Sequence, residues 1–238
     1  TVQAALFYAP DGNEKRPLLV ALHTWSGDYR QDHSIPYAEW SIEKRWILIH
    51  PDFRGPNKNP QATGSDLAVQ DVLDAVDYAK KHAVVDEDRI YLIGVSGGGY
   101  MSLLMAGRAP EVWAGVSAWV PLTDLKQWYI DSAEAGRNYS QDIVASVGGI
   151  PTQDPAAEEE CRKRSPLTYL AAAGDVPIDI NAGIHDGHTG SIPIRHSLHA
   201  FNLLADEKDR IADTDIDFMV EKEMVPPALS GDIEDDPL

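Results

Sequence analysis

Short apolar runs alternate with segments of helical spacing along most of the chain. The apolar runs are nearly continuous in hydrophobic residues, which is typical of strands covered on both faces. They span residues 16–23, 45–50, 89–94, 114–120 and 176–183. Helical spacing predicts helices over 65–83, 99–110 and 191–206. Strands that alternate with helices pair in parallel, so the pattern predicts an α/β fold with a doubly wound, mostly parallel sheet.

The ends and faces of the predicted helices can be read from single residues. Ser65 is a residue type that caps helix N-termini, so we expect it to begin the first helix. One apolar stripe is expected on that helix, made of Leu67, Val72, Val76 and Ala79. The third helix is expected to carry an apolar face of Ile194, Leu198, Phe201 and Ala205.

The domain organisation is predicted to be simple. A chain of 238 residues can form one α/β domain, and no internal linker or repeat divides it, so residues 1–238 are taken as one domain. Residues 121–170 are polar with a tryptophan-rich start and are predicted to be a cap or insertion. Residues 206–238 hold 12 acidic and 3 basic residues and are predicted to be an acidic tail whose final ten residues are poorly ordered.

The phrase "GVSGGG" at residues 94–99 carries the clearest chemical signal. Ser96 fits the pattern G-x-S-x-G, with an apolar strand before it and a helix after it. A sharp strand-to-helix turn of this kind needs small neighbours and exposes the serine hydroxyl above the sheet edge. The sequence therefore predicts Ser96 as a catalytic nucleophile and the backbone amide of Gly97 as an oxyanion donor. A tight turn without chemistry is the alternative.

Two further segments supply candidate partners for Ser96. The loop after the strand 16–23 reads His23-Thr24-Trp25, and the Trp25 amide is the candidate second oxyanion donor, with His23 shaping the loop. Asp186 follows the strand 176–183 in a loop and is the candidate acid, ahead of Asp175 and Asp179. His185 and His188 flank Asp186, but no third ligand has a recognisable spacing, so neither a metal nor a cofactor is predicted.

Charge and cysteine content narrow the classes of partner. The formal net charge is −18, which leaves no basic surplus for nucleic acid or for an anionic membrane surface. No apolar run approaches the roughly 20 residues that span a bilayer, and no signal-peptide pattern is present. Cys161, the single cysteine, excludes an intrachain disulfide and is predicted to be a spectator thiol. The compartment stays open, including an exported one, and so does the oligomeric state.

Together these residues resemble the catalytic domain of the prolyl oligopeptidase-like branch of the α/β-hydrolase fold. The resemblance rests on "DVLDAVDYAKKHAVVDEDRIYLIGVSGGGYMSLLMAG", on "SPLTYL" at 165–170, and on Gly183-x-x-Asp186 followed by Ile192-Pro193. Five residues, "GHTGS", separate Asp186 from that pair, where the family usually has two. The resemblance implies a Ser–Asp–His triad in that chain order.

This sequence differs from the family at the histidine of that triad. In the family it follows the last strand, whereas after Asp186 this sequence has only His188, His196 and His199. His196 and His199 fall on a predicted helix, where packing or solvent exposure is expected. The fold is therefore predicted to lack its last strand and histidine loop. Three explanations remain: a chain shorter than the native protein, a base in an unusual place such as His188, or a hydrolase-like binding protein without turnover.

The expected reaction is two-step acyl transfer by a serine hydrolase. A carboxylesterase is favoured, with a small ester or a decorated carbohydrate as substrate, because the chain begins almost directly with a hydrolase strand in "VQAALFYAP". A prolyl oligopeptidase-like peptidase is the alternative. Aromatic residues after the strand 114–120, Trp119 and Trp128 above all, are candidate substrate contacts together with Tyr29; a hydrophobic cap on the core is the competing interpretation.

Overall fold

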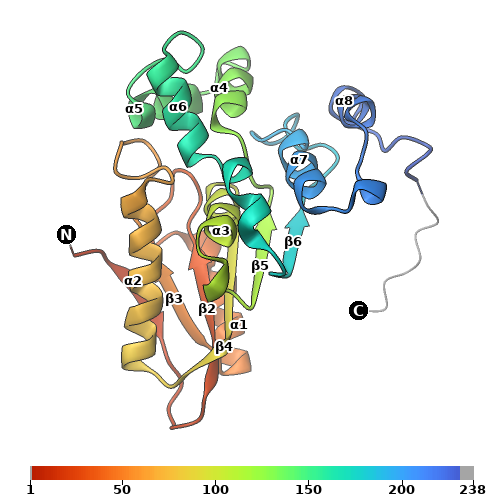
Figure 1. Ribbon diagram of the computed structural model, residues 1–238. Coiled ribbons are helices and arrows are strands. Elements are labelled where there is room, and N and C mark those ends of the chain that lie inside the picture. The colour runs from red at the N-terminus through yellow and green to blue at the C-terminus, as the bar shows by residue number, and fades with distance from the viewer. Residues whose placement is uncertain (1, 231–238) are drawn as a thin grey trace.

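A single twisted sheet organises the chain (Figure 1). The computed structural model describes residues 2–230, and within them the strand order is β1-β3-β2-β4-β5-β6. The strands are β1 (Ala5–Tyr8), β2 (Arg16–Leu22), β3 (Ile47–Pro51), β4 (Val85–Val95), β5 (Gly115–Trp119) and β6 (Ile178–Asn181). Strand β1 pairs antiparallel with β3, and the other neighbouring strands pair in parallel. The predicted α/β fold with a mostly parallel sheet is confirmed.

The α-helices connect and cover these strands. They are α1 (Ile35–Lys44), α2 (Asp66–His82), α3 (Gly97–Arg108), α4 (Leu125–Glu134), α5 (Tyr139–Val147), α6 (Pro155–Arg164), α7 (Arg195–Leu204) and α8 (Asp213–Lys222). Ser65 caps α2 as predicted, since its side chain accepts a hydrogen bond from the Ala68 amide at 3.2 Å. The predicted stripe on α2 is wrong at Leu67, which is 46% exposed; Ala68, one position further, is buried instead.

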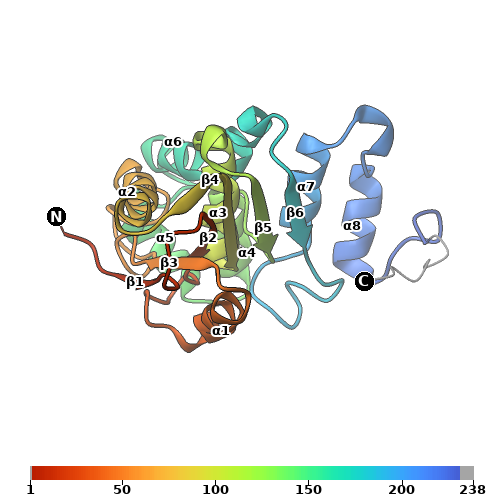
Figure 2. The ribbon, with the colours of Figure 1, turned by 90° about the horizontal axis from the view of Figure 1, so that it is seen from below.

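The continuous apolar character of the central strands follows from burial on both faces. Along β2, Leu18, Val20 and Leu22 belong to the main core with α2 and α3. The alternate residues Leu19 and Ala21 belong to a smaller cluster against α1 on the opposite face. Figure 2 shows α1 and α2 on opposite sides of the sheet. Because both faces are covered here, neither set of alternating positions could be polar.

Residues 121–170 form three of these helices, α4, α5 and α6, gathered beyond the carboxyl ends of the parallel strands (Figure 1). Segments in that place overhang the edge where ligands bind in open α/β sheets. These three helices form a layer beyond the carboxyl ends of the strands, near Ser96, and their role as a cap stays a prediction.

The acidic segment after residue 206 differs from the predicted tail. It contains α8, which packs against α7 and buries Ile216 and Met219, at 1% and 4% exposure. These two residues are spaced by three positions, so they share one face of the helix. Residues 231–238, most of the stretch expected to be poorly ordered, lie outside the described residues. Within residues 2–230 no helix is long and apolar enough to cross a membrane.

Candidate active site

Ser96 lies at the sharp turn between β4 and α3. Its φ of 58° and ψ of −117° place a residue with a side chain in a region that glycine normally occupies. The Ser96 amide donates to the Trp119 carbonyl at 2.8 Å, which ties the turn to the end of β5. The flanking glycines are required by space, because a Cβ on Gly94 would lie 2.3 Å from the Gly98 carbonyl carbon. The sequence-based interpretation of this phrase as a strained elbow therefore agrees with the geometry.

The two candidate oxyanion donors lie side by side. A Cβ on Gly97 would stand 2.3 Å from the Trp25 backbone nitrogen, so the loop after β2 packs directly on the start of α3. Gly97 is the first residue of α3, where an amide has no partner within the helix. Among residues 2–230 the Trp25 amide also has no hydrogen-bond acceptor. Two unpaired amides at a helix N-terminus can hold a negatively charged oxygen.

The side chains of His23 and Trp25 hold the loop after β2 in place through contacts with the core. His23 is buried, stacks on Phe53 at 3.8 Å, and its Nε2 lies 2.8 Å from the Asp52 carbonyl oxygen. Burial lowers the pKa of His23, which suits a neutral structural residue. The Trp25 indole donates to Asp142 Oδ2 at 3.1 Å and contacts Trp128 edge to face. His23 thus shapes the loop, as expected from the sequence.

Asp186 lies in the loop that follows β6. Residues Val95, Trp119 and Asn181 are in register at the ends of β4, β5 and β6, so this loop leaves the sheet at the same edge as Ser96. The Asp186 carboxylate accepts a hydrogen bond from the Gly183 amide at 2.7 Å. The other candidate acid, Asp179, is engaged within the sheet, where it accepts from Ser117 and Asn181.

The longer acid loop, residues 183–194, is held by the helical layer above it. Arg137, in the connection between α4 and α5, donates to the carbonyl oxygens of Gly187 at 3.1 Å, Gly190 at 2.9 Å and Ser191 at 3.2 Å. The Trp128 indole also donates to the Ser191 carbonyl, at 2.9 Å. The inserted "GHTGS" is therefore bound through its backbone. Sequence reasoning missed Arg137, because nothing in its local context "AGRNY" marks a partner 50 residues away.

His188 is directed to α8 rather than to the candidate nucleophile. Its Nε2 lies 2.7 Å from the Val220 carbonyl oxygen and its Nδ1 lies 3.5 Å from Glu223. His185 contacts the same carboxylate at 2.8 Å. Within residues 2–230 no hydrogen bond joins His188 to Ser96 or Asp186. In this arrangement His188 is not placed as the base.

His196 is buried on its helix, which agrees with the packing role, one of the two roles expected for it. Its Nδ1 accepts from the Thr123 amide at 3.2 Å, and its Nε2 lies 3.4 Å from Asp131 Oδ2. These contacts join α7 to α4 and to the segment after β5. His199 is half-buried, and burial lowers its pKa. The face predicted for α7 is wrong at Phe201, which is 40% exposed, because His196 and Ala200 pack inward instead.

The candidate substrate contacts fall into different environments. Trp128 is fully buried between Trp25 and Tyr139, so its substrate-binding assignment is wrong and the competing interpretation as part of the core describes it. Trp119 is 44% exposed at the end of β5, on the sheet face that carries α1. Tyr29 is partly buried, with the Arg30 guanidinium 5.2 Å from its ring centre. Trp119 and Tyr29 remain predictions.

Cys161 is remote from this chemistry. It is fully buried in α6, and burial raises the pKa of its thiol to about 12. A buried thiol that stays protonated is a poor nucleophile, which fits a spectator role.

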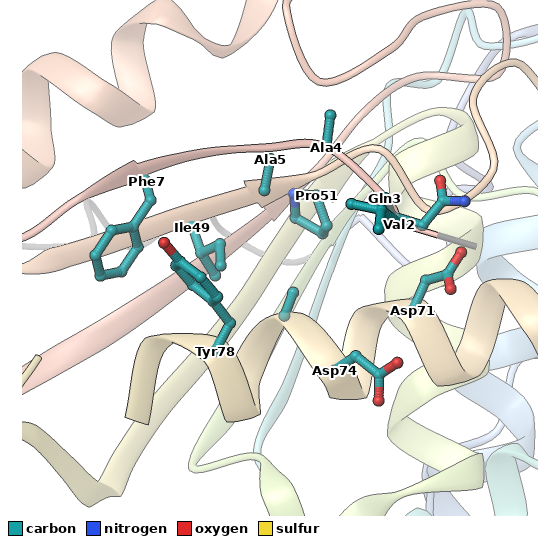
Figure 3. Close-up of a pocket in the computed structure, with 11 residues that line it drawn as sticks. Val2, Gln3, Ala4, Ala5, Phe7, Ile49, Pro51, Asp71, Asp74 and Tyr78 are labelled. Carbon is teal, nitrogen blue, oxygen red and sulfur yellow. The ribbon is translucent and has the colours of Figure 1, made fainter. Parts of the chain in front are cut away.

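A cavity of about 420 Å³ lies between β1 and α2, and Figure 3 shows its lining. Asp71 lies at its rim and forms a largely buried ion pair with Arg54, 2.6 Å from Oδ2 to Nε. Two strands separate β1 from β4, the strand that leads into Ser96, so this cavity is remote from Ser96.

Comparison with known proteins identifies the family to which this chain is similar. The model of the prolyl oligopeptidase family matches residues 61–222. Acylamino-acid-releasing enzyme 2 of Oryza sativa subsp. japonica is 22% identical over 206 residues, which are 76% of this chain and 26% of that protein. Feruloyl esterase B of Thermothelomyces thermophilus is 28% identical over 117 residues, covering 44% of this chain and 40% of its own.

Solved structures share the fold. The uncomplexed acylaminoacyl peptidase of Pyrococcus horikoshii matches with a TM-score of 0.69 at 19% identity, over 85% of this chain and 32% of that one. A puromycin-hydrolyzing peptidase of Mycobacterium tuberculosis matches with a TM-score of 0.63 at 20% identity, over 87% and 32%. The chain thus spans between a quarter and two fifths of the length of these relatives. Its fold is that of the α/β-hydrolases, and the chain belongs to the prolyl oligopeptidase family.

Proposed function

We propose that this chain carries the acyl-transfer site of a serine hydrolase, with Ser96 as the nucleophile. The observation that carries the proposal is the junction of Ser96, Gly97 and Trp25: a strained serine at a helix N-terminus beside two amides without partners. A structural turn alone would not need a second loop packed on the helix start with its amide unpaired.

The reaction proceeds in two steps. A base removes the Ser96 hydroxyl proton as its oxygen adds to the substrate carbonyl, and the Gly97 and Trp25 amides stabilise the oxyanion. The carbonyl re-forms as the leaving group departs with that proton, leaving an acyl-enzyme. Water, deprotonated by the same base, then attacks the acyl carbon and releases the carboxylic acid and the free serine. Asp186 is assigned the role of orienting the base.

The residue that acts as the base is left unassigned in this proposal. In residues 2–230 His23 and His196 are buried and bonded, and His188 contacts α8. Without a base the Ser96 hydroxyl stays protonated at neutral pH and reacts slowly. A histidine between Ser96 and Asp186 would complete the site.

Carboxylic esters are the proposed substrates, and peptides or acylated amino acids are the second candidate. Amide cleavage demands protonation of a poor leaving group by the histidine, whereas an activated ester leaves with far less help. A feruloyl esterase among the relatives supports the ester proposal. The acylaminoacyl peptidases among the relatives and structures support the peptidase alternative.

Labelling with a fluorophosphonate tests the site directly. We expect mass spectrometry to find the label on Ser96, and the Ser96→Ala chain to stay unlabelled. The 238-residue chain is compared with the full protein that its gene encodes: labelling of the full protein alone places the base outside residues 1–238, and labelling of both requires a base within them. If neither form is labelled, the hydrolase proposal fails and a binding protein without turnover takes its place.

Turnover of 4-nitrophenyl acetate against an aminoacyl 4-nitroanilide then separates the two substrate classes. We expect the ester to be cleaved and the anilide to be cleaved slowly or not at all. Efficient cleavage of the anilide would move the assignment to a peptidase.

A further inference from the structure

A polar cavity of about 570 Å³ opens beside the oxyanion loop. Three segments line it: Trp25 and Ser26 after β2, Pro56 to Lys58 after β3, and residues 136–142 at the start of α5. Its lining therefore joins the loops after β2 and β3 to the connection between α4 and α5.

Two cations face this cavity without an acidic partner. Lys58 is exposed, and no carboxylate in residues 2–230 pairs with its ammonium. The Arg137 guanidinium binds carbonyl oxygens, which are neutral, so its positive charge also stays uncompensated within that part of the chain. Those three bonds leave N–H groups unused, because a guanidinium carries five. The chain carries a net charge of −18, yet neither of these two cations that line the cavity has a carboxylate partner in residues 2–230.

Asp142 is the third charged residue that lines the cavity, and it is already bonded. Asp142 accepts a hydrogen bond from the Trp25 indole at 3.1 Å, so its carboxylate is committed to holding the oxyanion loop. Lys58 and Arg137 against Asp142 leave one net positive charge. A single negative charge on a ligand balances it, which favours a carboxylate over a dianionic phosphate.

Arg137 also gives the position of this cavity relative to the reacting groups. The same side chain that lines the cavity with Trp25 and Ser26 is bonded to the acid loop at Gly187, Gly190 and Ser191. It therefore spans from the loop that supplies the oxyanion amide to the loop that supplies Asp186. A substrate whose carbonyl lies at the Trp25 amide has its remaining atoms within reach of this cavity.

We propose that Lys58 and Arg137 form a subsite for a carboxylate carried by the substrate, away from the bond that is cleaved. The proposal rests on the hydrolase function proposed above and narrows its substrates to acidic esters or amides. Charge-assisted hydrogen bonds from an ammonium and a guanidinium supply the preference for the anion. Because Lys58 is exposed, added salt should weaken that preference.

Four esters measure the preference, since the carboxylate could lie on either side of the cleaved bond. Mono-4-nitrophenyl glutarate and its methyl ester differ in charge on the acyl side. 4-Acetoxybenzoate and its methyl ester differ on the leaving-group side. We expect wild-type protein, in the form that fluorophosphonate labels, to favour the acid over the methyl ester about tenfold in kcat/KM in one of the pairs.

Lys58→Glu is the variant, because Lys58 has no side-chain bond that folding would lose. Lys81→Glu is the matched control: the same charge change on an exposed lysine at the end of α2. We expect Lys58→Glu to abolish the preference for the acid over its methyl ester. We expect Lys81→Glu to keep both that preference and the wild-type turnover of the methyl ester within about twofold. Equal rates for acid and methyl ester in both pairs, or the same ratio in both variants, would overturn the subsite.

Binding of glutarate separates this proposal from the proposed function. Amide chemical shifts of Ser26, Lys58 and Asn138 are followed by NMR during titration of the wild-type chain. If no ester is cleaved and Ser96 is not labelled, the hydrolase function fails, yet the subsite stands when glutarate shifts these amides and Lys58→Glu weakens binding about tenfold. The subsite is ruled out if glutarate shifts none of these amides and the protein shows no preference for the acid over the methyl ester in either pair.

Discussion

Gly97 and Trp25 are packed so closely that a Cβ on the glycine would stand 2.3 Å from the tryptophan's backbone nitrogen. Real Cβ atoms do not approach backbone nitrogen to that distance, so the pair can exist only with glycine at position 97. The contact holds the two candidate oxyanion amides next to each other, and it joins segments that the sequence separates widely.

Gly97→Ala should therefore damage both stability and reactivity. The added methyl group forces the loop away from α3, which we expect to lower the free energy of unfolding by about 1–3 kcal/mol and to slow fluorophosphonate labelling by at least tenfold. Urea unfolding and labelling rates measure the two effects. In Gly190→Ala a Cβ meets only Asp186 Oδ1, at 3.9 Å, so stability should stay near wild type. An unimpaired Gly97→Ala chain would contradict the packing.

Ser96→Gly should make the protein more stable and chemically silent. Glycine adopts φ 58° and ψ −117° without the strain that a side chain experiences there, so we expect a gain of about 1 kcal/mol. Ser96→Ala is the paired variant: it also removes the hydroxyl but keeps a Cβ and hence the strain. Thermal unfolding of the two variants should differ by a few degrees, with glycine higher. Equal melting temperatures would mean that the turn stores no strain.

Arg137→Ala should loosen the acid loop while the sheet stays intact. Losing the guanidinium leaves the Gly187 and Gly190 carbonyl oxygens without this donor, and the Ser191 carbonyl keeps only the Trp128 indole. We expect amide hydrogen exchange to speed up about tenfold or more over residues 183–194 and to remain unchanged in β4 and α3. Arg137→Lys, which keeps the charge but cannot reach all three carbonyls, should fall between. Unchanged exchange in the loop would show that Trp128 alone is enough to hold it.

His50 should make the fold sensitive to mild acid. Burial is the main reason that its pKa falls from 6.5 to about 4 in the folded state, and His23 nearby adds to the shift. Because the folded pKa is below the unfolded one, the folded state favours the neutral ring. The stability this provides is complete above pH 6.5 and is lost as the pH falls from about 6.5 to about 4, on the order of 3 kcal/mol.

Urea unfolding between pH 7.5 and 4 measures that dependence, with His50→Gln for comparison. We expect the glutamine variant to show a shallower loss of stability on acidification. Parallel curves for the two proteins would assign the acid sensitivity to other groups.

Cys161 should resist modification in the native protein. Its thiol is fully buried, and its raised pKa keeps the reactive thiolate scarce at pH 8. Iodoacetamide should alkylate it only after denaturation, as mass spectrometry can show. Rapid alkylation of the folded chain would mean that α6 opens readily.

Local patterns were enough to identify the fold. The strands β2 to β6 and the helices α2, α3 and α7 follow from apolar runs and helical spacing, and the elbow at Ser96 follows from "GVSGGG" between a strand and a helix. These features depend on residues that are neighbours in sequence, because side-chain periodicity and backbone strain are local properties. Asp186 could likewise be placed at the Ser96 edge, since parallel strands end at one side of a sheet.

Tertiary structure decided which of these residues meet. Trp25 binds Asp142, 117 positions away, and Arg137 binds the acid loop 50 or more positions away, although neither residue has a local signature. The same packing buried Trp128 and His196, exposed Leu67, and turned His188 towards α8. A sequence pattern gives the face a side chain takes, but only the close packing of separate elements decides what covers that face. That is why a candidate nucleophile could be named from six residues, while the contacts around it required the tertiary structure.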